Sequence, residues 1–288
     1  MTGQPAAPRI AFQGERGAFS EEAAILLLGE RIELVPRPTF GALYAAIDEG
    51  AADLVLAPVE NTLAGTVVAS LDRLLESGLH ANGEVIIPIV HCLIGTPEAT
   101  IERIASVESH PVALAQCERF LRAHPEMARR ATLDTGGSVA EIVRAGDPTR
   151  AAIAGRRAAE IHGGRILREH VEDHPENYTR FLLLAPSPEF SPRANHLSLV
   201  IELAHAPGAL HTALGVFARR SINLLKIESR PLAGRPWQYR FYLDLQASLN
   251  DPSTREALEE LGCGVASMRI LGCYPAWQPT PDGKALSR

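Results

Sequence analysis

The first two-thirds of the chain alternates short apolar runs with stretches of helical periodicity. Continuous apolar runs predict buried strands, and apolar positions that recur every three or four residues predict helices. Strands are expected at residues 9–12, 53–59, 85–94 (with a break at Pro88), 104–108, 131–133, 151–154 and 180–184. Helices are expected at residues 19–29 and 66–77 and in stretches that end near residues 124, 146 and 163. This alternation predicts an α/β domain with a parallel sheet covered by helices on both faces.

A proline-rich stretch separates this pattern from a second one. Residues 186–192 hold three prolines in seven positions, which is typical of a linker. Strands are then expected at residues 196–203, 222–230, 237–246 and 265–272, and helices at 208–220 and 252–261. This βαββαβ order is the ferredoxin-like arrangement. We therefore expect an α/β domain over residues 8–186, a linker over 187–194, an α+β domain over 195–276 and a tail over 277–288.

Composition narrows the class of protein. The 288 residues are 46% hydrophobic and 22% charged, which supplies a core and excludes a disordered chain or a collagen. A net charge of −6 with scattered arginines makes nucleic-acid binding a poor expectation. The four cysteines form no Cys-x-x-Cys pair, no signal peptide is recognisable, and no apolar run approaches the ~20 residues of a membrane helix. We expect a cytoplasmic protein without membrane association.

Four loops carry the candidate chemistry of the α/β domain. Each follows an expected strand and opens an expected helix, at residues 14–20, 60–66, 109–111 and 135–138. In open α/β sheets this edge binds ligands, and the free N–H groups of helix N-termini favour anions. The loops contain serine, threonine, asparagine and glycine instead of lysine clusters, which suits a small carboxylate better than a polyphosphate. Taken singly, each loop could be only a cap or a tight turn.

Other motifs carry less weight. His170 and His174 flank two acidic residues, but a proline follows and no further ligand lies near in sequence, so no metal site is expected. Neither a G-x-S-x-G elbow nor the signature of a nucleophilic cysteine occurs. Glu60 could act as an acid–base residue or could accept backbone N–H groups.

Several strings of residues, in order, resemble one family. Residues 58–62 (Pro-Val-Glu-Asn-Thr), 109–117 (Ser-His-Pro-Val-Ala-Leu-Ala-Gln-Cys) and 177–181 (Asn-Tyr-Thr-Arg-Phe) together resemble prephenate dehydratase. The second domain resembles the ACT regulatory domain of the same family. Its strings are residues 208–210 (Gly-Ala-Leu), 228–231 (Glu-Ser-Arg-Pro) and 271–275 (Leu-Gly-Cys-Tyr-Pro). The resemblance extends from about residue 9 to residue 275, nearly the whole chain.

The resemblance implies a reaction and a fold. Prephenate would lose water and carbon dioxide to become phenylpyruvate, a step of phenylalanine biosynthesis. Aromatisation drives this reaction, so the resemblance implies neither a metal nor another cofactor. The implied fold is a catalytic domain of two α/β lobes around a cleft, similar to periplasmic binding proteins, followed by a ferredoxin-like ACT domain.

The resemblance also implies site residues. Thr179 would donate a hydrogen bond to the leaving hydroxyl. The catalytic residues carried over by the resemblance are Thr179, Asn61, Ser109 and Gln116. The expected substrate-binding residues are Ser20, Glu60, Thr62, Thr135, Ser138, Arg180 and Phe181. Arg180 could pair with a substrate carboxylate or form an internal salt bridge, and Phe181 could belong to the core or stack on the substrate ring.

The ACT resemblance implies regulation by a small effector. L-Phenylalanine would bind between ACT domains of a homodimer or homotetramer and inhibit the enzyme. The residues expected to bind it are Gly208, Ala209, Leu210, Asn223, Leu224, Glu228, Ser229, Arg230 and Pro231. The chain is expected to be monofunctional, because the first strand begins too early for a preceding chorismate mutase domain.

Two other functions stay open at this point. Arogenate dehydratase shares these motifs and differs in its substrate. A non-catalytic sensor, made of a binding-protein fold and an ACT domain, would bind a small molecule without turnover and would not need Thr179.

Overall fold

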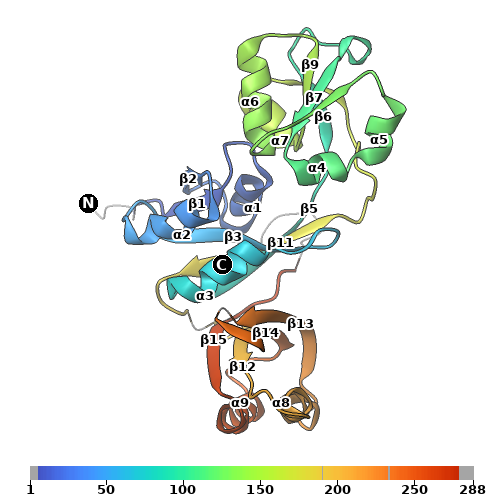
Figure 1. The fold of residues 1–288 in the computed structure, drawn as a ribbon. Coiled ribbons are helices and arrows are strands. Elements are labelled where there is room, and N and C mark those ends of the chain that lie inside the picture. Colours follow the sequence, from blue (N-terminus) through green and yellow to red (C-terminus); the bar gives the residue numbers. More distant parts are fainter. Residues whose placement is uncertain (1–5, 190, 233, 279–288) are drawn as a thin grey trace, which may run out of the picture. The chain divides into compact units, whose positions relative to one another are not determined.

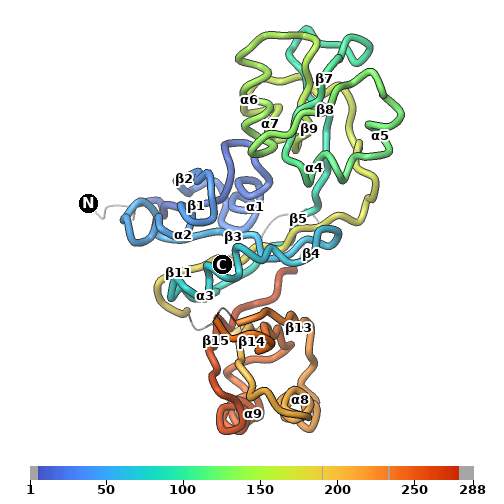
Figure 2. The backbone as a smooth tube through the Cα atoms, viewed as in Figure 1, coloured from blue at the N-terminus to red at the C-terminus, as the bar shows by residue number. Residues whose placement is uncertain are grey.

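The computed structural model describes residues 6–189, 191–232 and 234–278, which fall into two compact units (Figures 1 and 2). The first unit contains the residues up to Ser77 and Val85–Leu182, and the second contains Gly78–Glu84 and Leu183–Gln278. Residues 279–288 of the expected tail lie outside the described residues. Among the described residues, no helix is both long and apolar enough to cross a membrane.

The first lobe of the first unit is built on parallel strands. Strand β1 (Arg9–Gln13) pairs in parallel with β2 (Glu33–Arg37) and with β3 (Leu54–Asn61). The strand order is β5-β11-β3-β1-β2, where β5 spans His80–Pro88 and β11 spans Tyr178–Ala185, and the short β4 (Gly65–Thr66) pairs with β3. Three helices pack against β1 or β3: α1 (Phe19–Leu28), α2 (Phe40–Asp48) and α3 (Val68–Ser77).

The second lobe is a five-stranded sheet with helices on both faces (Figure 1). Its strand order is β10-β6-β9-β7-β8, formed by Arg165–Arg168, Cys92–Gly95, Arg150–Ala154, Ser106–Ser109 and Ala128–Ala131. A 3-10 turn (Ile101–Arg103) precedes β7. One apolar cluster joins the sheet to α4 (Pro111–Ala115) and α5 (Glu118–Ala123). Another joins it to α6 (Thr135–Ala145) and α7 (Arg156–His162), so the expected coverage of both faces is confirmed.

The expectation of a parallel sheet is only partly right. Strand β7 runs parallel to β8 and β9, but β6 runs antiparallel to both β9 and β10. The chain reaches β6 from β5 through residues 89–91 alone, after the break expected at Pro88. The start of β6 at Cys92 therefore pairs with the end of β9 at Ala154, and the two strands run in opposite directions.

Three strands that the pattern missed or displaced share a position in the fold. Strands β2 and β10 were not expected, and β8 lies at Ala128–Ala131 instead of at residues 131–133. All three are edge strands of their sheets. Edge strands bury less surface, and the residues of β8 are all exposed, so no apolar run marked them. Helix α2 was also missed.

The second unit has the expected βαββαβ order. Its elements are β12 (His196–Glu202), α8 (Ala209–Ala218), β13 (Asn223–Leu232), β14 (Arg235–Gln246), α9 (Pro252–Gly264) and β15 (Ser267–Tyr274). The antiparallel sheet has the order β13-β14-β12-β15, and both helices bury their apolar faces in one cluster against it. The ferredoxin-like prediction is confirmed.

Candidate functional site

The candidate site centres on Asn61, the last residue of β3. Its amide Nδ2 donates to Asn177 Oδ1 at 2.8 Å and to Thr179 Oγ1 at 2.9 Å. Its Oδ1 accepts from the backbone N–H groups of Leu63 and Ala64, at 3.0 and 2.7 Å. Since only the oxygen of an amide can accept backbone N–H groups, these two bonds fix the amide orientation. Thr179 Oγ1 is therefore an acceptor toward Asn61, and its own hydrogen is left to donate elsewhere.

Asn177 extends this network into the second lobe. It is fully buried, and its Nδ2 donates to Oε1 of Gln116 at 3.0 Å. Gln116 is the C-cap residue of α4, the helix that follows β7 of the second sheet. The same Oε1 lies 2.9 Å from Nε2 of His91, which must donate because an amide oxygen only accepts. A continuous network of hydrogen bonds thus links His91 to Thr179 through Gln116 and the two asparagines.

His91 and the role of Asn177 were missed from the sequence. His91 is 1% exposed, its ring meets the Phe19 ring edge-on at 5.6 Å, and burial lowers the pKa of its imidazole. The available signal was a histidine inside the otherwise apolar stretch 85–94. Asn177 stood in the string that resembles the family but was given no function. Both residues lie on the segments that connect the two lobes.

Thr62 and Glu60 make contacts within the protein. The Thr62 hydroxyl accepts the backbone N–H of Tyr178 at 2.9 Å and donates to the carbonyl of Glu176 at 3.0 Å. It holds the turn after β3 against the segment that enters β11. A nitrogen of the Arg180 guanidinium lies 3.8 Å from Glu60, so the internal salt bridge expected as one alternative for Arg180 is present.

The remaining predicted hydroxyls serve their own loops. Ser109 is fully buried and donates to the carbonyl of Ile153 at 2.6 Å. Ser138 bonds to the hydroxyl of Thr132 and to the carbonyl of Asp134, both at 2.7 Å. Thr135 begins α6 and Ser20 lies buried in the first turn of α1. Phe181 is 2% exposed, so its ring belongs to the core.

Two of the four predicted loops meet closely. A Cβ atom on Gly136 would lie 2.7 Å from the carbonyl oxygen of Arg16, and one on Gly17 would lie 2.7 Å from Cα of Ala158. Gly17 also has φ +85°, a conformation that favours glycine. The N-terminal ends of α1 and α6 therefore approach each other across the lobes.

A buried carboxylate stabilises this contact between the two lobes. The side chain of Glu21 on α1 is fully buried and accepts from Arg16 at 2.8 Å, from the Gly17 N–H at 2.9 Å and from Arg157 of the second lobe at 2.8 Å. Burial by itself would raise the pKa of Glu21. The hydrogen bonds from Arg16, Gly17 and Arg157 more than offset burial, so the pKa lies below its usual range. Glu21 is thus an ionised link between the lobes.

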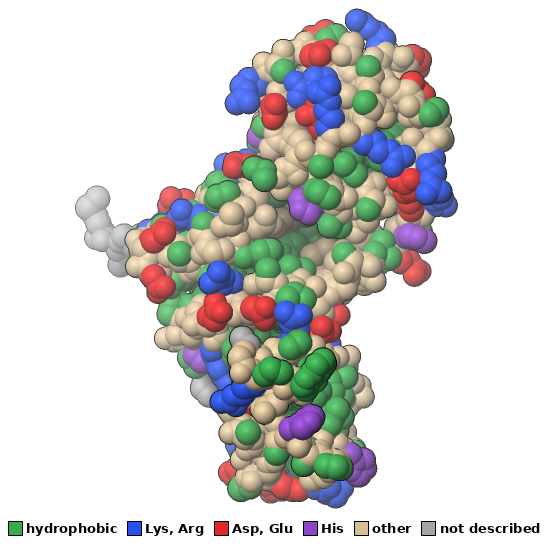
Figure 3. Space-filling model, viewed as in Figure 1, with side chains coloured by type: hydrophobic (Ala, Val, Ile, Leu, Met, Phe, Trp, Pro, Cys, Tyr) green, Lys and Arg blue, Asp and Glu red, His purple; other side chains and the backbone are tan. Residues whose placement is uncertain are grey.

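The described residues hold no cluster of three or more His, Cys, Asp and Glu side chains that could bind a metal ion. Burial also disfavours the thiolate form of the two cysteines next to His91 and Gln116 in the sequence. Burial raises the pKa of Cys92 to about 11 and raises that of Cys117 further. On the face seen in Figure 3, acidic and basic side chains are interspersed.

A second candidate site lies on the sheet of the second unit. Gly208, with φ +80°, immediately precedes α8, and Ala209 and Leu210 form its first turn. Asn223 and Leu224 begin β13, and residues 228–231 lie near its end. Because β12 and β13 both pair antiparallel with β14, β12 and β13 run parallel. The start of α8 and the end of β13 therefore lie at the same edge of the sheet, which groups residues 208–210 with 228–231, whereas Asn223 and Leu224 lie toward the opposite edge.

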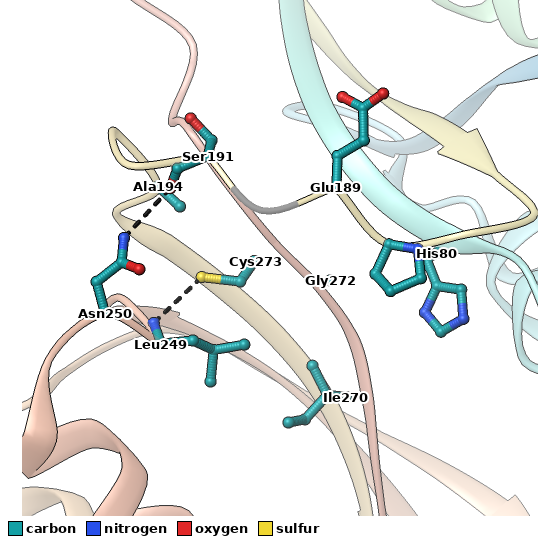
Figure 4. A pocket seen from close by; sticks show the side chains of 10 residues that line it. His80, Glu189, Ser191, Ala194, Leu249, Asn250, Ile270, Gly272 and Cys273 are labelled. Atoms are coloured by element: carbon teal, nitrogen blue, oxygen red, sulfur yellow. Dashed lines mark hydrogen bonds between the residues drawn. The ribbon is translucent and has the colours of Figure 1, made fainter.

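The second unit also contains a small cavity of about 170 Å³ (Figure 4). Residues of the linker, of β15 and of the segment around Leu249 line it, and most of its wall is apolar. The Leu249 N–H donates to Sγ of Cys273 at 3.4 Å, one of the contacts drawn in the figure. None of the predicted effector residues lines it.

Two family descriptions match the chain. The model of "Prephenate dehydratase" matches residues 10–189, and that of "ACT domain" matches residues 197–263. The chain is 39% identical to "Arogenate dehydratase/prephenate dehydratase 2, chloroplastic" of Arabidopsis thaliana, over 93% of this chain and 72% of that protein.

Two solved structures are similar over nearly the whole chain. A prephenate dehydratase in complex with L-Phe from Arthrobacter aurescens is 28% identical with a TM-score of 0.84, covering 97% of this chain and 92% of that one. A structure described as a novel type of quorum quenching acylase is 33% identical with a TM-score of 0.85, covering 95% and 99%.

The buried link at Glu21 leads to a stability prediction. Glu21→Gln is expected to lower the free energy of unfolding by about 2 kcal/mol at neutral pH, because charged hydrogen bonds at a buried site are lost. A carboxyl whose pKa is depressed in the fold stabilises above its unfolded pKa of about 4.3 and loses this contribution as pH falls through the folded pKa. The difference between parent and variant, measured by urea unfolding, should therefore shrink in acid.

Glu49→Gln is the matched control. Glu49 pairs with Arg37 at 3.4 Å, but its side chain is 54% exposed, so its loss should cost about 0.5 kcal/mol or less. Equal costs for the two variants, or a Glu21→Gln effect that persists unchanged in acid, would contradict the assignment.

Proposed function

Because the chain belongs to the prephenate dehydratase family and carries an ACT domain, we propose that its inter-lobe site converts prephenate to phenylpyruvate, with Thr179 as the donor to the leaving hydroxyl. The observation that carries this proposal is the 2.9 Å bond from Asn61 Nδ2 to Thr179 Oγ1. That bond occupies a lone pair of the hydroxyl and leaves its hydrogen for the substrate.

The reaction requires the protein mainly to position the substrate and to stabilise the charge that develops on it. The bond between the ring and its carboxylate breaks, carbon dioxide leaves, and the electron pair enters the ring as the hydroxyl departs from the opposite carbon. The departing hydroxide takes up one proton from solvent and leaves as water. A threonine hydroxyl is far too weak an acid to surrender its proton freely, so Thr179 acts by stabilising the developing negative charge with a hydrogen bond.

The dianionic substrate needs donors, and the site offers several. The Oε1 atom of Gln116 accepts two N–H groups, so its NH₂ group is directed away from them and is available to a substrate oxygen. The N-terminal turns of α1 and α6 bring positive dipole ends together across the lobes, with Ser20 and Thr135 in them. We assign the substrate carboxylates to these donors.

Prephenate is preferred over arogenate in this proposal. The two compounds differ in the side chain, which carries a keto group in prephenate and an ammonium group in arogenate. An ammonium group calls for an acidic partner, and the acidic residue of the loop, Glu60, already lies beside Arg180. That pairing favours the uncharged keto group.

An acylase function, suggested by the description of one similar structure, is less well supported. Amide hydrolysis calls for an activated nucleophile or a metal-bound water. The Ser109 hydroxyl donates to a backbone carbonyl, and the thiols of Cys92 and Cys117 are held protonated by burial. His91 donates to Gln116 instead of serving any of these groups.

We assign regulation to the ACT domain, which we place at residues 195–276 after a catalytic domain over 8–186. L-Phenylalanine would bind between the ACT domains of a homo-oligomer, with its carboxylate at the start of α8 and residues 228–231 completing the site. Binding would shift a conformational equilibrium that is linked to turnover. The four cysteines carry free thiols, in keeping with a cytoplasmic location.

The direct test is Thr179→Ala. Turnover of prephenate, followed by phenylpyruvate formation, should fall by about a hundredfold or more in kcat with little change in KM, because a transition-state donor is removed. Thr179→Ser keeps the hydroxyl and should retain part of the rate. The parent is assayed in parallel with arogenate and with an acyl amide.

Three outcomes would contradict the proposal. Near-parental turnover by folded Thr179→Ala would remove the assigned donor. Faster turnover of arogenate than of prephenate would reverse the substrate preference. Hydrolysis of the amide without any dehydratase activity would favour the acylase function.

Regulation is tested at Gly208. A valine there would have to adopt φ +80°, which costs enough to displace the first turn of α8. Gly208→Val should raise the L-phenylalanine concentration needed for half-inhibition by about tenfold while basal kcat stays at the parental level. Gly146→Val, at φ +66° beside the α6 end in the first unit, is the matched control.

Inhibition curves decide this prediction. An unchanged response to L-phenylalanine in Gly208→Val, or an equal shift in Gly146→Val, would place the effector elsewhere.

A further inference from the structure

His91 sits at the end of the hydrogen-bond chain that reaches Thr179. It lies on the short connection between β5 and β6 and is 1% exposed. Its Nε2 donates to Oε1 of Gln116 at 2.9 Å. Its other ring nitrogen, Nδ1, is buried and has no hydrogen-bond partner among the described residues. Buried polar groups without partners are rare, so this arrangement calls for an explanation.

The two nitrogens together define the tautomer. Nε2 must carry a hydrogen, because the amide oxygen of Gln116 only accepts. A second hydrogen on Nδ1 would be a buried donor without an acceptor, which is costly. Burial also lowers the pKa of the imidazole, in agreement with a ring that carries one hydrogen. His91 is therefore built as a single-hydrogen donor aimed at Gln116.

The ring is held firmly in this orientation. The backbone N–H of His91 donates to Glu172 Oε2 at 2.8 Å, and its carbonyl accepts from the Val171 N–H at 3.0 Å. The Phe19 ring packs edge-on against the imidazole. The two backbone bonds fix the position of His91 on its connection, and Phe19 from the first lobe restricts rotation of the imidazole.

Gln116 gains its orientation from this contact. A glutamine side chain in a half-exposed position can exchange its oxygen and nitrogen by rotation at small cost. Two donors converge on Oε1 here, from His91 and from Asn177, and both would clash electrostatically with an NH₂ group. The rotation is therefore blocked, and the NH₂ group stays directed toward the substrate.

We propose that His91 is a positioning residue of the dehydratase, which holds the Gln116 amide so that its nitrogen donates to the substrate. This inference rests on the proposed role of Gln116 as a substrate donor. His91 does not itself touch the substrate. It converts a flexible amide into a fixed donor before the substrate arrives, and preorganised donors contribute most to catalysis.

The experiment compares two substitutions at this position. His91→Phe keeps an aromatic ring against Phe19 but removes the N–H, and kcat for prephenate should fall by about tenfold to a hundredfold. His91→Gln places an amide N–H near the position of Nε2 and should restore much of the lost kcat. Thermal unfolding and L-phenylalanine binding report whether each variant is folded, and Gln116→Leu serves as the reference for complete loss of the donor.

A spectroscopic measurement identifies the tautomer of His91. ¹⁵N chemical shifts of the imidazole in the parent should show the hydrogen on Nε2 and a bare Nδ1, in the free protein. A merely structural histidine would have no reason to lose catalytic rate in the Phe variant while being rescued by glutamine.

The possible results test the role of His91 and the role of Gln116 separately. Parental kcat in folded His91→Phe with impaired Gln116→Leu, or a hydrogen on Nδ1, would overturn the role of His91 and leave the proposed site intact. Parental kinetics in Gln116→Leu would overturn the donor role of Gln116 and with it this inference. Loss of kcat in His91→Phe, rescue in His91→Gln and impairment in Gln116→Leu would establish it.

Discussion

The amide of Asn61 is the interaction on which the site depends. Its oxygen is held by two backbone N–H groups of the following turn, and its nitrogen is thereby forced toward Asn177 and Thr179. Every later assignment follows from that fixed direction. The Thr179 hydroxyl accepts and so must donate outward, while Asn177 accepts with its oxygen and so donates to Gln116. In the proposed mechanism, a hydroxyl without a useful pKa is made effective by controlling which way its single hydrogen points.

The fold places these groups by bringing chain segments together at one junction. Asn61 ends a central parallel strand, Gln116 caps the C-terminal end of α4 in the second lobe, and His91 and Asn177 lie on the connections between the lobes. The lobes are also joined by the close glycine contacts around Gly17 and Gly136 and by the Glu21 carboxylate with Arg157. The site is thus made of residues whose positions depend on both lobes at once.

The sequence predicted the structure well for buried strands and for residues that lie in family motifs. The central strands and the ferredoxin-like order were predicted because apolar runs mark buried strands. Asn61, Gln116 and Thr179 were predicted as one group because they lie in the sequence motifs that resemble the family. Edge strands such as β8 were missed or displaced, since exposed residues leave no apolar pattern. His91 was missed because a single histidine in an apolar stretch gives no sign of its partner 25 positions away. Thr62 and Ser138 were expected to bind substrate. Nothing in the sequence indicated that their hydroxyls donate to the backbone carbonyls of Glu176 and Asp134.

The central claim is that the Asn61 amide acts on the reaction through Thr179, and a double-mutant cycle tests it most directly. Asn61→Leu removes the amide that donates to Thr179 Oγ1, and Thr179→Ala removes the hydroxyl. If Asn61 works through Thr179, kcat of the double variant should equal that of Thr179→Ala within about twofold, because residues that act as a unit are not additive. Independent losses in kcat that multiply in the double variant, with all three proteins folded, would contradict the account.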